Sequence, residues 1–272
     1  MTRLLCLRGV ALVVAACALG APALADLDLN MPQGVTTGGR EIYGLHMLIL
    51  WVCVLIASGV YLAMIVAIVR FRKAAGAIPA KFTHNTTAEV IWTVIPAVIL
   101  IALAVPAART LVRLEDTRDS DLTIRITGYQ WQWHYEYIDA GVSFYSRLAP
   151  QSNAARQPGS GIDPFSVENY LLDVTEDVVV PVGAKVRLLI GAADVLHAWW
   201  VPDLGVKKDA IPGFINESWF EAVEEGTFRG QCAELCGMDH GFMPIVVRVV
   251  SQDAYQSWLT EKLGAQPTAG ER

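Results

Sequence analysis

The sequence predicts a hairpin of two membrane-spanning helices followed by an exported all-β domain. Two long apolar runs lie in the first half of the chain, and short runs rich in Val, Ile, Tyr and Trp fill the second half. The chain is 53% hydrophobic with a mean hydropathy of +0.39, which is too apolar for an ordinary soluble domain and too polar for a chain embedded throughout. A net charge of -6 excludes a basic nucleic-acid binder and favours a cationic partner.

The N-terminal segment has the order of residues that is typical of a secretory signal peptide. Arginines precede an apolar core that begins at Val10, and Ala23 and Ala25 form a small-residue cleavage site. We therefore predict a signal peptide over residues 1–25. A lipoprotein cleavage site before Cys17 is the alternative, although the apolar run continues past it, and a lipid on Cys17 stays open.

Two apolar runs predict the membrane spans. Residues 45–69 and 90–108 are each long enough to cross about 30 Å of hydrocarbon as a helix, so that residues 26–116 hold an N-terminal segment and a hairpin. Pro96 and Pro106 predict kinks or a helix end rather than loss of the second span. Basic residues fill the loop between the spans: Arg70, Arg72, Lys73 and Lys81. The positive-inside rule then places this loop in the cytoplasm and both termini on the periplasmic side of a bacterial inner membrane.

Beyond residue 116 the pattern changes to that of an all-β sandwich or barrel, which we expect over residues 117–251. The clearest strand signals lie at 122–126, 178–182, 186–190 and 245–250. Residues 149–163 have the composition of a polar loop rich in Pro, Gly and Ser. In the final segment, 252–272, the apolar spacing over 253–263 predicts an amphipathic packing helix followed by a disordered tail.

A dense group of soft ligands lies near the end of the predicted β-domain. Cys232, Cys236, His240 and Met243 offer two thiolates, an imidazole and a thioether within twelve residues. This donor set suits copper, whereas calcium or magnesium would need oxygen ligands. Zinc is the nearest rival, and the nearby methionine and the β-domain favour copper over it. We expect His197, in the loop at the end of the predicted strand 186–190, to supply a further ligand; a Cys232–Cys236 disulfide and a core His197 remain alternatives.

The order Cys232-x-Glu-x-Cys236-x-x-x-His240-x-x-Met243, with His197 upstream in Asp-Val-Leu-His, resembles the CuA motif of cytochrome c oxidase subunit II. The resemblance extends through three further segments and covers essentially the whole mature chain. These segments are residues 89–96, 128–137 and 207–213. It implies a cupredoxin-like Greek-key domain after the hairpin.

The resemblance also implies a set of metal ligands. Cys232 and Cys236 would bridge two copper ions. His197 and Met243 would complete one ion, while His240 and the backbone carbonyl of Glu234 would complete the other. The side chain of Glu234 would bind Mg²⁺ or Mn²⁺ shared with subunit I. Ligands held by a stiff β-scaffold move little when an electron arrives, so this centre would relay electrons.

Other residues gain roles from the same resemblance. Trp131 would receive electrons from cytochrome c. Packing of an aromatic strand is the plain alternative for this residue. Tyr129 and Gln132 depart from the family pattern in this segment. Glu136 and Asp194 would help to dock a basic cytochrome c, with solvated surface charge as the plain alternative. Glu89 would lie at the mouth of a proton-uptake path, with simple helix-end placement as its alternative.

The function implied is that of the electron-receiving subunit of a respiratory terminal oxidase. It would take electrons from cytochrome c and pass them to haem in subunit I, where oxygen is reduced to water and protons are pumped. Subunits I and III and the lipid bilayer are the expected partners. The rivals are a copper-free quinol-oxidase subunit, a nitrous oxide reductase domain, a CuA subunit of a nitric oxide reductase-type complex, and a zinc-stabilised or disulfide-bonded sensor.

Overall fold

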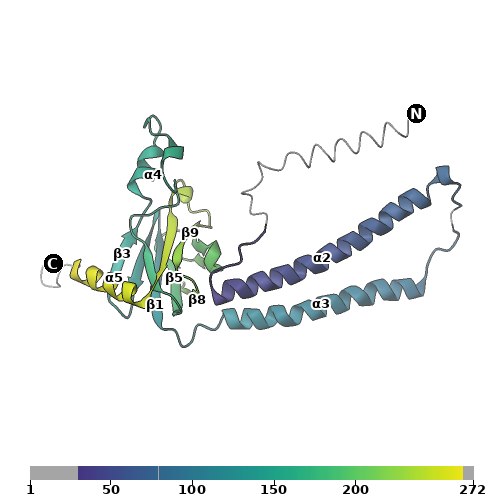
Figure 1. Ribbon diagram of the computed structural model, residues 1–272, viewed down its shortest axis with the longest axis horizontal. Helices are drawn as coiled ribbons and strands as arrows, with labels where there is room; N and C mark the ends of the chain where they lie inside the picture. The colour runs from purple at the N-terminus through teal and green to yellow at the C-terminus, as the bar shows by residue number, and fades with distance from the viewer. Residues whose placement is uncertain (1–29, 79, 266–272) are drawn as a thin grey trace. The chain divides into compact units, whose positions relative to one another are not determined.

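The computed structural model describes residues 30–78 and 80–265, and it contains two long helices and a β-sandwich (Figure 1). The predicted signal peptide at 1–25 and the tail from residue 266 onward lie outside the described residues. The two long helices are α2 (Thr37–Arg70) and α3 (Thr86–Leu114). Both are apolar and long enough to cross a membrane.

Side chains at the N-terminus of each long helix define where it begins. The hydroxyl of Thr36 accepts a hydrogen bond from the backbone N–H of Gly39, and the side chain of Asn85 accepts one from Ala88. Each bond satisfies a backbone donor that the first helical turn leaves without a partner. Both helices extend beyond the predicted spans, and α3 continues through Pro96 and Pro106 without ending.

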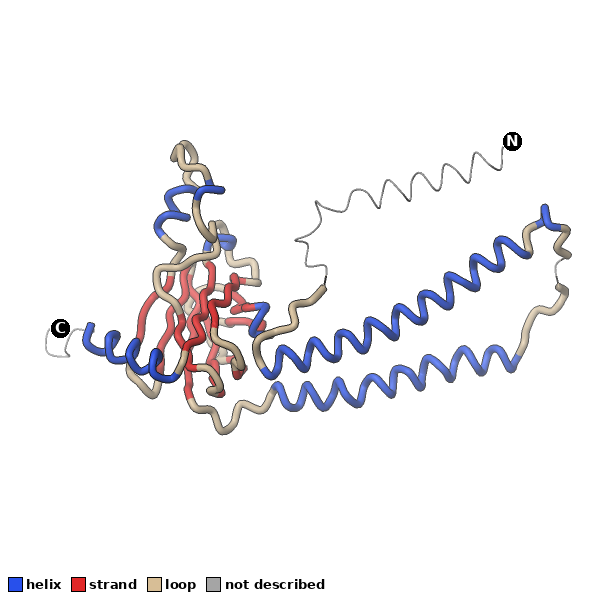
Figure 2. The backbone as a smooth tube through the Cα atoms, viewed as in Figure 1, coloured by secondary structure: helices blue, strands red, loops and turns tan. Residues whose placement is uncertain are grey.

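The second half of the chain forms two five-stranded sheets (Figure 2). The first has the strand order β3-β2-β1-β5-β8 and the second the order β4-β10-β9-β6-β7. The strands are β1 (Leu122–Tyr129), β2 (Gln132–Tyr137), β3 (Val142–Ser146), β4 (Val178–Pro181), β5 (Lys185–Ala192), β6 (His197–Val201), β7 (Val206–Ala210), β8 (Asn216–Glu221), β9 (Gly226–Cys232) and β10 (Pro244–Val250). The prediction of a helical hairpin followed by a β-sandwich of cupredoxin type is confirmed.

The core lies between the sheets, and alternation along the strands builds it. Ile124 and Ile126 of β1 are buried, as are Tyr135 and Tyr137 of β2. Because side chains on a strand alternate between its faces, one face of each strand packs inward. The Tyr137 hydroxyl also joins the two sheets: it donates to the carbonyl of Val179 in β4 at 2.8 Å and accepts from the same residue's N–H at 2.9 Å.

Two further helices differ in how well the sequence predicted them. The C-terminal helix α5 (Gln252–Ala265) packs against the β-domain, with its Trp258 ring 5.1 Å from that of Tyr137 and edge-on to that of Phe144. This agrees with a packing role. The prediction of a plain loop over 149–163 was wrong in part, because a short helix, α4 (Pro150–Ala155), begins there. Pro at the first helical position favours such a start.

Candidate metal centre

Three neighbouring strands of the second sheet bring the predicted ligands together. His197 is the first residue of β6 and Cys232 is the last residue of β9, and these strands pair with Trp199 opposite Cys232. Met243 directly precedes β10, which pairs with β9 on its other side. His197 therefore lies on a strand rather than in the strand-end loop that the sequence suggested. Strand pairing fixes its position relative to Cys232.

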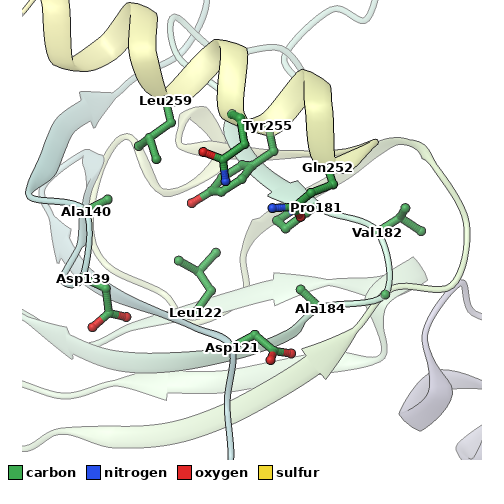
Figure 3. Close-up of a pocket in the computed structure, with 12 residues that line it drawn as sticks. Asp121, Leu122, Asp139, Ala140, Pro181, Val182, Ala184, Gln252, Tyr255 and Leu259 are labelled. Carbon is green, nitrogen blue, oxygen red and sulfur yellow. The ribbon is translucent and has the colours of Figure 1, made fainter.

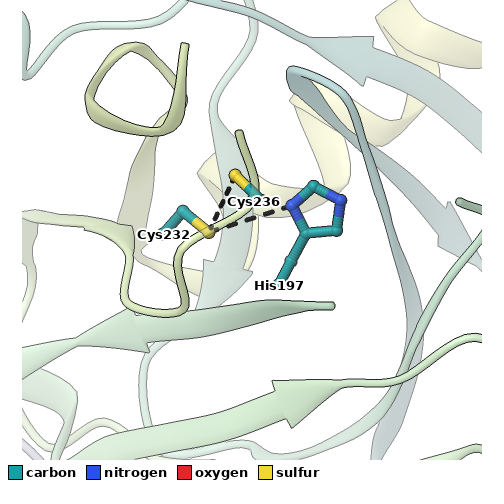
Figure 4. A group of neighbouring side chains, drawn as sticks. All are labelled: His197, Cys232 and Cys236. Atoms are coloured by element: carbon teal, nitrogen blue, oxygen red, sulfur yellow. Dashed lines mark hydrogen bonds between the residues drawn. The ribbon is translucent and has the colours of Figure 1, made fainter. Parts of the chain in front are cut away.

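The side chains of His197, Cys232 and Cys236 converge in one buried group (Figure 4), and His240 and Met243 lie against it. The Cys232 Sγ lies 3.9 Å from both the Cys236 Sγ and the His197 Nδ1. The Cys236 Sγ lies 3.5 Å from the Nδ1 of His240 and 3.5 Å from the Sδ of Met243. His197 is fully buried, and both cysteines and Met243 are at most 5% exposed. Sulfur and nitrogen donors thus already lie close together, and these four residues are shielded from solvent.

The backbone carbonyl of Glu234 also reaches this cluster, because its oxygen lies 3.3 Å from the Cys232 Sγ. The side chain of Glu234 is exposed. The two groups of this residue therefore face different surroundings, as a residue with one backbone and one side-chain role would require.

Cys232 and Cys236 are free thiols in this structure. Their sulfurs are 3.9 Å apart, about twice the length of an S–S bond. The predicted alternative of a disulfide is therefore not what the structure contains. The donors that remain are two thiols, two imidazoles and a thioether, a set that fits copper better than a hard cation.

Burial and charge give the two thiols different acidities. Burial, together with the nearby Cys232, raises the pKa of Cys236 to about 12. Burial opposes ionisation of Cys232 as well, but the hydrogen bond to His197, backbone hydrogen bonds at Ala198 and Glu234 and the charge of His197 together lower the pKa of Cys232. The two sulfurs therefore differ in acidity, and a bound cation would favour the ionised form of both.

Asp194 orients His197 from the side away from the thiols. Its Oδ1 lies 3.0 Å from the His197 Nε2, and its carboxylate also accepts backbone N–H bonds from Val195 and Gln130, each at 2.7 Å. Partial burial opposes ionisation of this carboxyl, but the bond to His197 and these backbone bonds lower the pKa of Asp194. The Nδ1 of His197 is left facing Cys232. A carboxylate that holds a ligand imidazole in this way fixes the ring's orientation.

Sequence reasoning treated Asp194 only as a docking acid and missed its contact with His197. The spacing of three residues between Asp194 and His197 was the available signal. Sequence reasoning also missed Gly128, which lies directly against His197. A Cβ added at this position would lie 2.8 Å from the His197 ring. Only glycine leaves room for this imidazole.

Trp131 lies against the cysteine loop. Its indole N–H donates to the carbonyl of Cys236 at 3.2 Å, and the side-chain amide of Gln130 donates to the same oxygen at 2.9 Å. The indole N–H of the buried Trp133 approaches the carbonyl of Met243 at 3.4 Å. The aromatic strand thus contacts the backbone of the cluster at two points.

The remaining predicted site residues lie outside the cluster. Glu136 forms a cross-strand ion pair with Arg125 at 2.8 Å on an exposed face. Glu89 is in the first turn of α3, where its carboxylate accepts the backbone N–H of Asn85 at 3.3 Å. The structure gives Glu89 a place at a helix start, and the proton-path role stays a prediction.

A separate cavity of about 560 Å³ lies under α5 (Figure 3). Asp121, Asp139 and Tyr255 are among the side chains that face it. Its walls come from the start of β1 and the end of β4, which are the strand ends away from the cluster. Among the residues that the structure describes, no cysteine, histidine or methionine lines it.

The fold and the cluster define a class of protein: a membrane-anchored cupredoxin-type domain with a group of Cys, His and Met side chains that could hold a metal. Two family models match the chain. The model for the transmembrane domain of cytochrome c oxidase subunit II matches residues 25–109, and the model for the periplasmic domain matches residues 122–250. The chain belongs to the cytochrome c oxidase subunit II family, whose members are parts of a haem–copper oxidoreductase complex.

Individual relatives agree with this assignment. A cytochrome c oxidase subunit 2 of Cereibacter sphaeroides is 36% identical over 95% of this chain and 91% of its own length. The corresponding protein of Triticum aestivum is 37% identical over 87% of this chain and 90% of its own length. A crystal structure of the periplasmic domain of subunit II from Bradyrhizobium japonicum is 43% identical, covers 54% of this chain and 97% of its own, and has a TM-score of 0.47.

Proposed function

We propose that this chain is the copper-bearing, electron-receiving subunit of a respiratory cytochrome c oxidase. The observation that carries the proposal is that His240 and Met243 lie against the buried group formed by His197, Cys232 and Cys236. Bound copper would supply a one-electron Cu(II)/Cu(I) couple. The family assignment alone makes the chain a subunit of the oxidase, and the cluster gives it a specific role as an electron relay.

In this proposal the cluster holds two copper ions. Cys232 and Cys236 would be shared by both ions, His197 and Met243 would hold one, and His240 with the carbonyl of Glu234 would hold the other. The chain's own part is to hold these donors still: strand ladders position His197 and Cys232, and burial excludes water. Donors that are already in place need little rearrangement when the charge changes, which favours rapid electron transfer.

Electrons would arrive from cytochrome c through Trp131. The bond from its indole to the Cys236 carbonyl supports this, because it links a partly exposed ring to the backbone of a copper ligand. Glu136 and Asp194 would attract the basic face of the donor, and part of each carboxylate remains accessible. Their bonds to Arg125 and His197 would make these sites weaker than two free carboxylates.

Electrons would leave for haem in subunit I, where oxygen is reduced to water and protons are pumped. The exposed carboxylate of Glu234 would bind Mg²⁺ or Mn²⁺ shared with subunit I, and Glu89 would lie at the mouth of a proton-uptake path. Subunit III is a further expected partner. The metal domain and both termini would face the periplasm of a bacterial inner membrane, after removal of a signal peptide at 1–25 or lipidation at Cys17.

A nitric oxide reductase-type complex is not favoured as the alternative. The relatives from Cereibacter sphaeroides and Triticum aestivum carry the name cytochrome c oxidase subunit 2 at 36–37% identity over most of this chain.

The test is to load the full chain in detergent with copper and record its electron paramagnetic resonance spectrum. One unpaired electron shared equally by two copper nuclei gives seven hyperfine lines, whereas a single copper ion gives four. We expect the seven-line pattern, with about two copper ions per chain. A four-line signal would contradict the two-ion centre, and a chain that takes up only zinc would overturn the proposal.

A further inference from the structure

The long segment between β3 and β4, called the excursion below, is held at its two ends by backbone hydrogen bonds. The backbone N–H of Ala149 donates to Asp173 at 3.0 Å, and that of Thr175 donates to Arg147 at 2.8 Å. Ser152 of α4 is fully buried, and its hydroxyl accepts the N–H of Leu171 at 3.2 Å. These bonds fix α4 and Arg156, which directly follows it.

Arg156 reaches from this excursion to the turn that carries His240. Its two terminal nitrogens lie 3.2 Å from the two carboxylate oxygens of Asp239, and its guanidinium carbon lies 4.2 Å above the ring of Phe242. Its Nε donates to the side-chain oxygen of Asn153 at 2.8 Å, and this bond within the excursion orients the guanidinium toward Asp239. The Arg156 and Asp239 side chains are 21% and 25% exposed, so water screens this pair less than an open surface pair.

The turn itself has few supports of its own. It contains the 3-10 helix η5 (His240–Phe242), which is preceded by Gly237 and by Met238, a side chain that is 83% exposed. The backbone hydrogen bonds within the turn are short-range, from Phe242 to Asp239 at 2.9 Å and from His240 to Gly237 at 3.3 Å. Contacts at Asp239 and Phe242 therefore hold the turn on both sides of His240.

We propose that Arg156 is a positioning residue that holds the His240 turn, so that the His240 Nδ1 stays 3.5 Å from the Cys236 Sγ. The inference rests on the proposed function, because it takes His240 as a copper ligand. A planar guanidinium suits this role, because it bonds both oxygens of one carboxylate and stacks on an aromatic ring at the same time. An ammonium group would retain the charge but lose the paired geometry.

The test compares three variants of the full chain in detergent: Arg156→Gln, Arg156→Lys and Arg147→Gln. Arg147 is the matched control, because it lines the same cavity of about 210 Å³ beside Trp131 but bonds to Gln132 instead of the turn. Hydrogen exchange of residues 237–243 is measured without metal. Copper release to a chelator and the copper hyperfine pattern are measured after loading.

We expect Arg156→Gln to increase exchange in 237–243, to speed copper release by on the order of tenfold and to alter the hyperfine pattern. Arg156→Lys should restore part of both effects, and Arg147→Gln should match the parent. Unchanged exchange and release in Arg156→Gln, or equal changes in Arg147→Gln, would overturn the inference. Faster exchange throughout β1 and β5 would also overturn it, since the effect would then be general loosening.

The two proposals fail in different ways. If the parent chain binds no copper, the proposed function fails, while selective exchange in Arg156→Gln still supports the contact that holds the turn. If the parent gives the expected copper signal and Arg156→Gln is indistinguishable from it, only the inference about Arg156 fails.

Discussion

The indole N–H of Trp131 donates a hydrogen bond to the backbone carbonyl of Cys236 over 3.2 Å. These residues are 105 positions apart in the chain. The contact joins the ring that we propose as the electron entry point to the backbone of Cys236, a proposed copper ligand. Trp131 could therefore affect electron transfer directly through its ring or indirectly through the position of the Cys236 loop. Different substitutions of Trp131 are needed to distinguish these two effects.

Trp131→Ala should slow electron transfer from reduced cytochrome c by roughly tenfold or more, because the ring between donor and cluster is lost. Trp131→Phe keeps a ring and loses the N–H bond, and should retain more of the rate. Stopped-flow oxidation of cytochrome c measures the rate, and the copper spectrum reports on the loop. An unchanged rate in Trp131→Ala would refute the role of this residue.

Gly128→Ala should displace His197, since the new Cβ would lie 2.8 Å from the imidazole ring. Overpacking of this kind typically costs about 1–3 kcal/mol, which we expect to appear as weaker copper retention against a chelator. Gly241→Ala is the control within the ligand turn, where a Cβ meets nothing within 4 Å. Equal copper retention in the two variants would show that room beside His197 is unimportant.

Met243→Leu should alter the copper spectrum with little loss of fold stability. The side chain is 1% exposed, and its sulfur lies 3.5 Å from the Cys236 Sγ. Leucine has a similar volume, so the free energy of unfolding without metal should change by less than about 1.5 kcal/mol. Met238→Leu changes an 83% exposed methionine of the same loop and should leave the spectrum unaltered. Identical spectra for all three proteins would exclude Met243 as a ligand.

Tyr137→Phe should destabilise the β-domain by about 1–3 kcal/mol, because it leaves the Val179 N–H and carbonyl without their inter-sheet partner. Tyr135→Phe removes one longer bond, from the Trp199 indole at 3.2 Å, and should cost less. Urea unfolding of the metal-free chain measures both variants. A larger loss for Tyr135→Phe would contradict the view that Tyr137 ties the sheets together.

The hairpin and the earlier strands were predictable because their signals are local. An uncharged apolar run identifies a span such as α2, and alternation identifies a strand such as β1. The helix α4 was missed because its six residues are too few to show a helical period. His197 was expected in a loop because it follows the predicted strand 186–190, whereas it begins a strand of its own, β6, that pairs with β9.

The sequence by itself determined the types and spacing of the candidate ligands, and with them the family, because soft donors close together in a chain are a local chemical signal. Tertiary structure decided which outside groups hold those donors: Gly128 beside His197, Trp131 on the Cys236 carbonyl and Arg156 on Asp239, which is 83 positions away. Strand pairing and loop packing create such contacts. They depend on how distant segments meet, which no local pattern encodes.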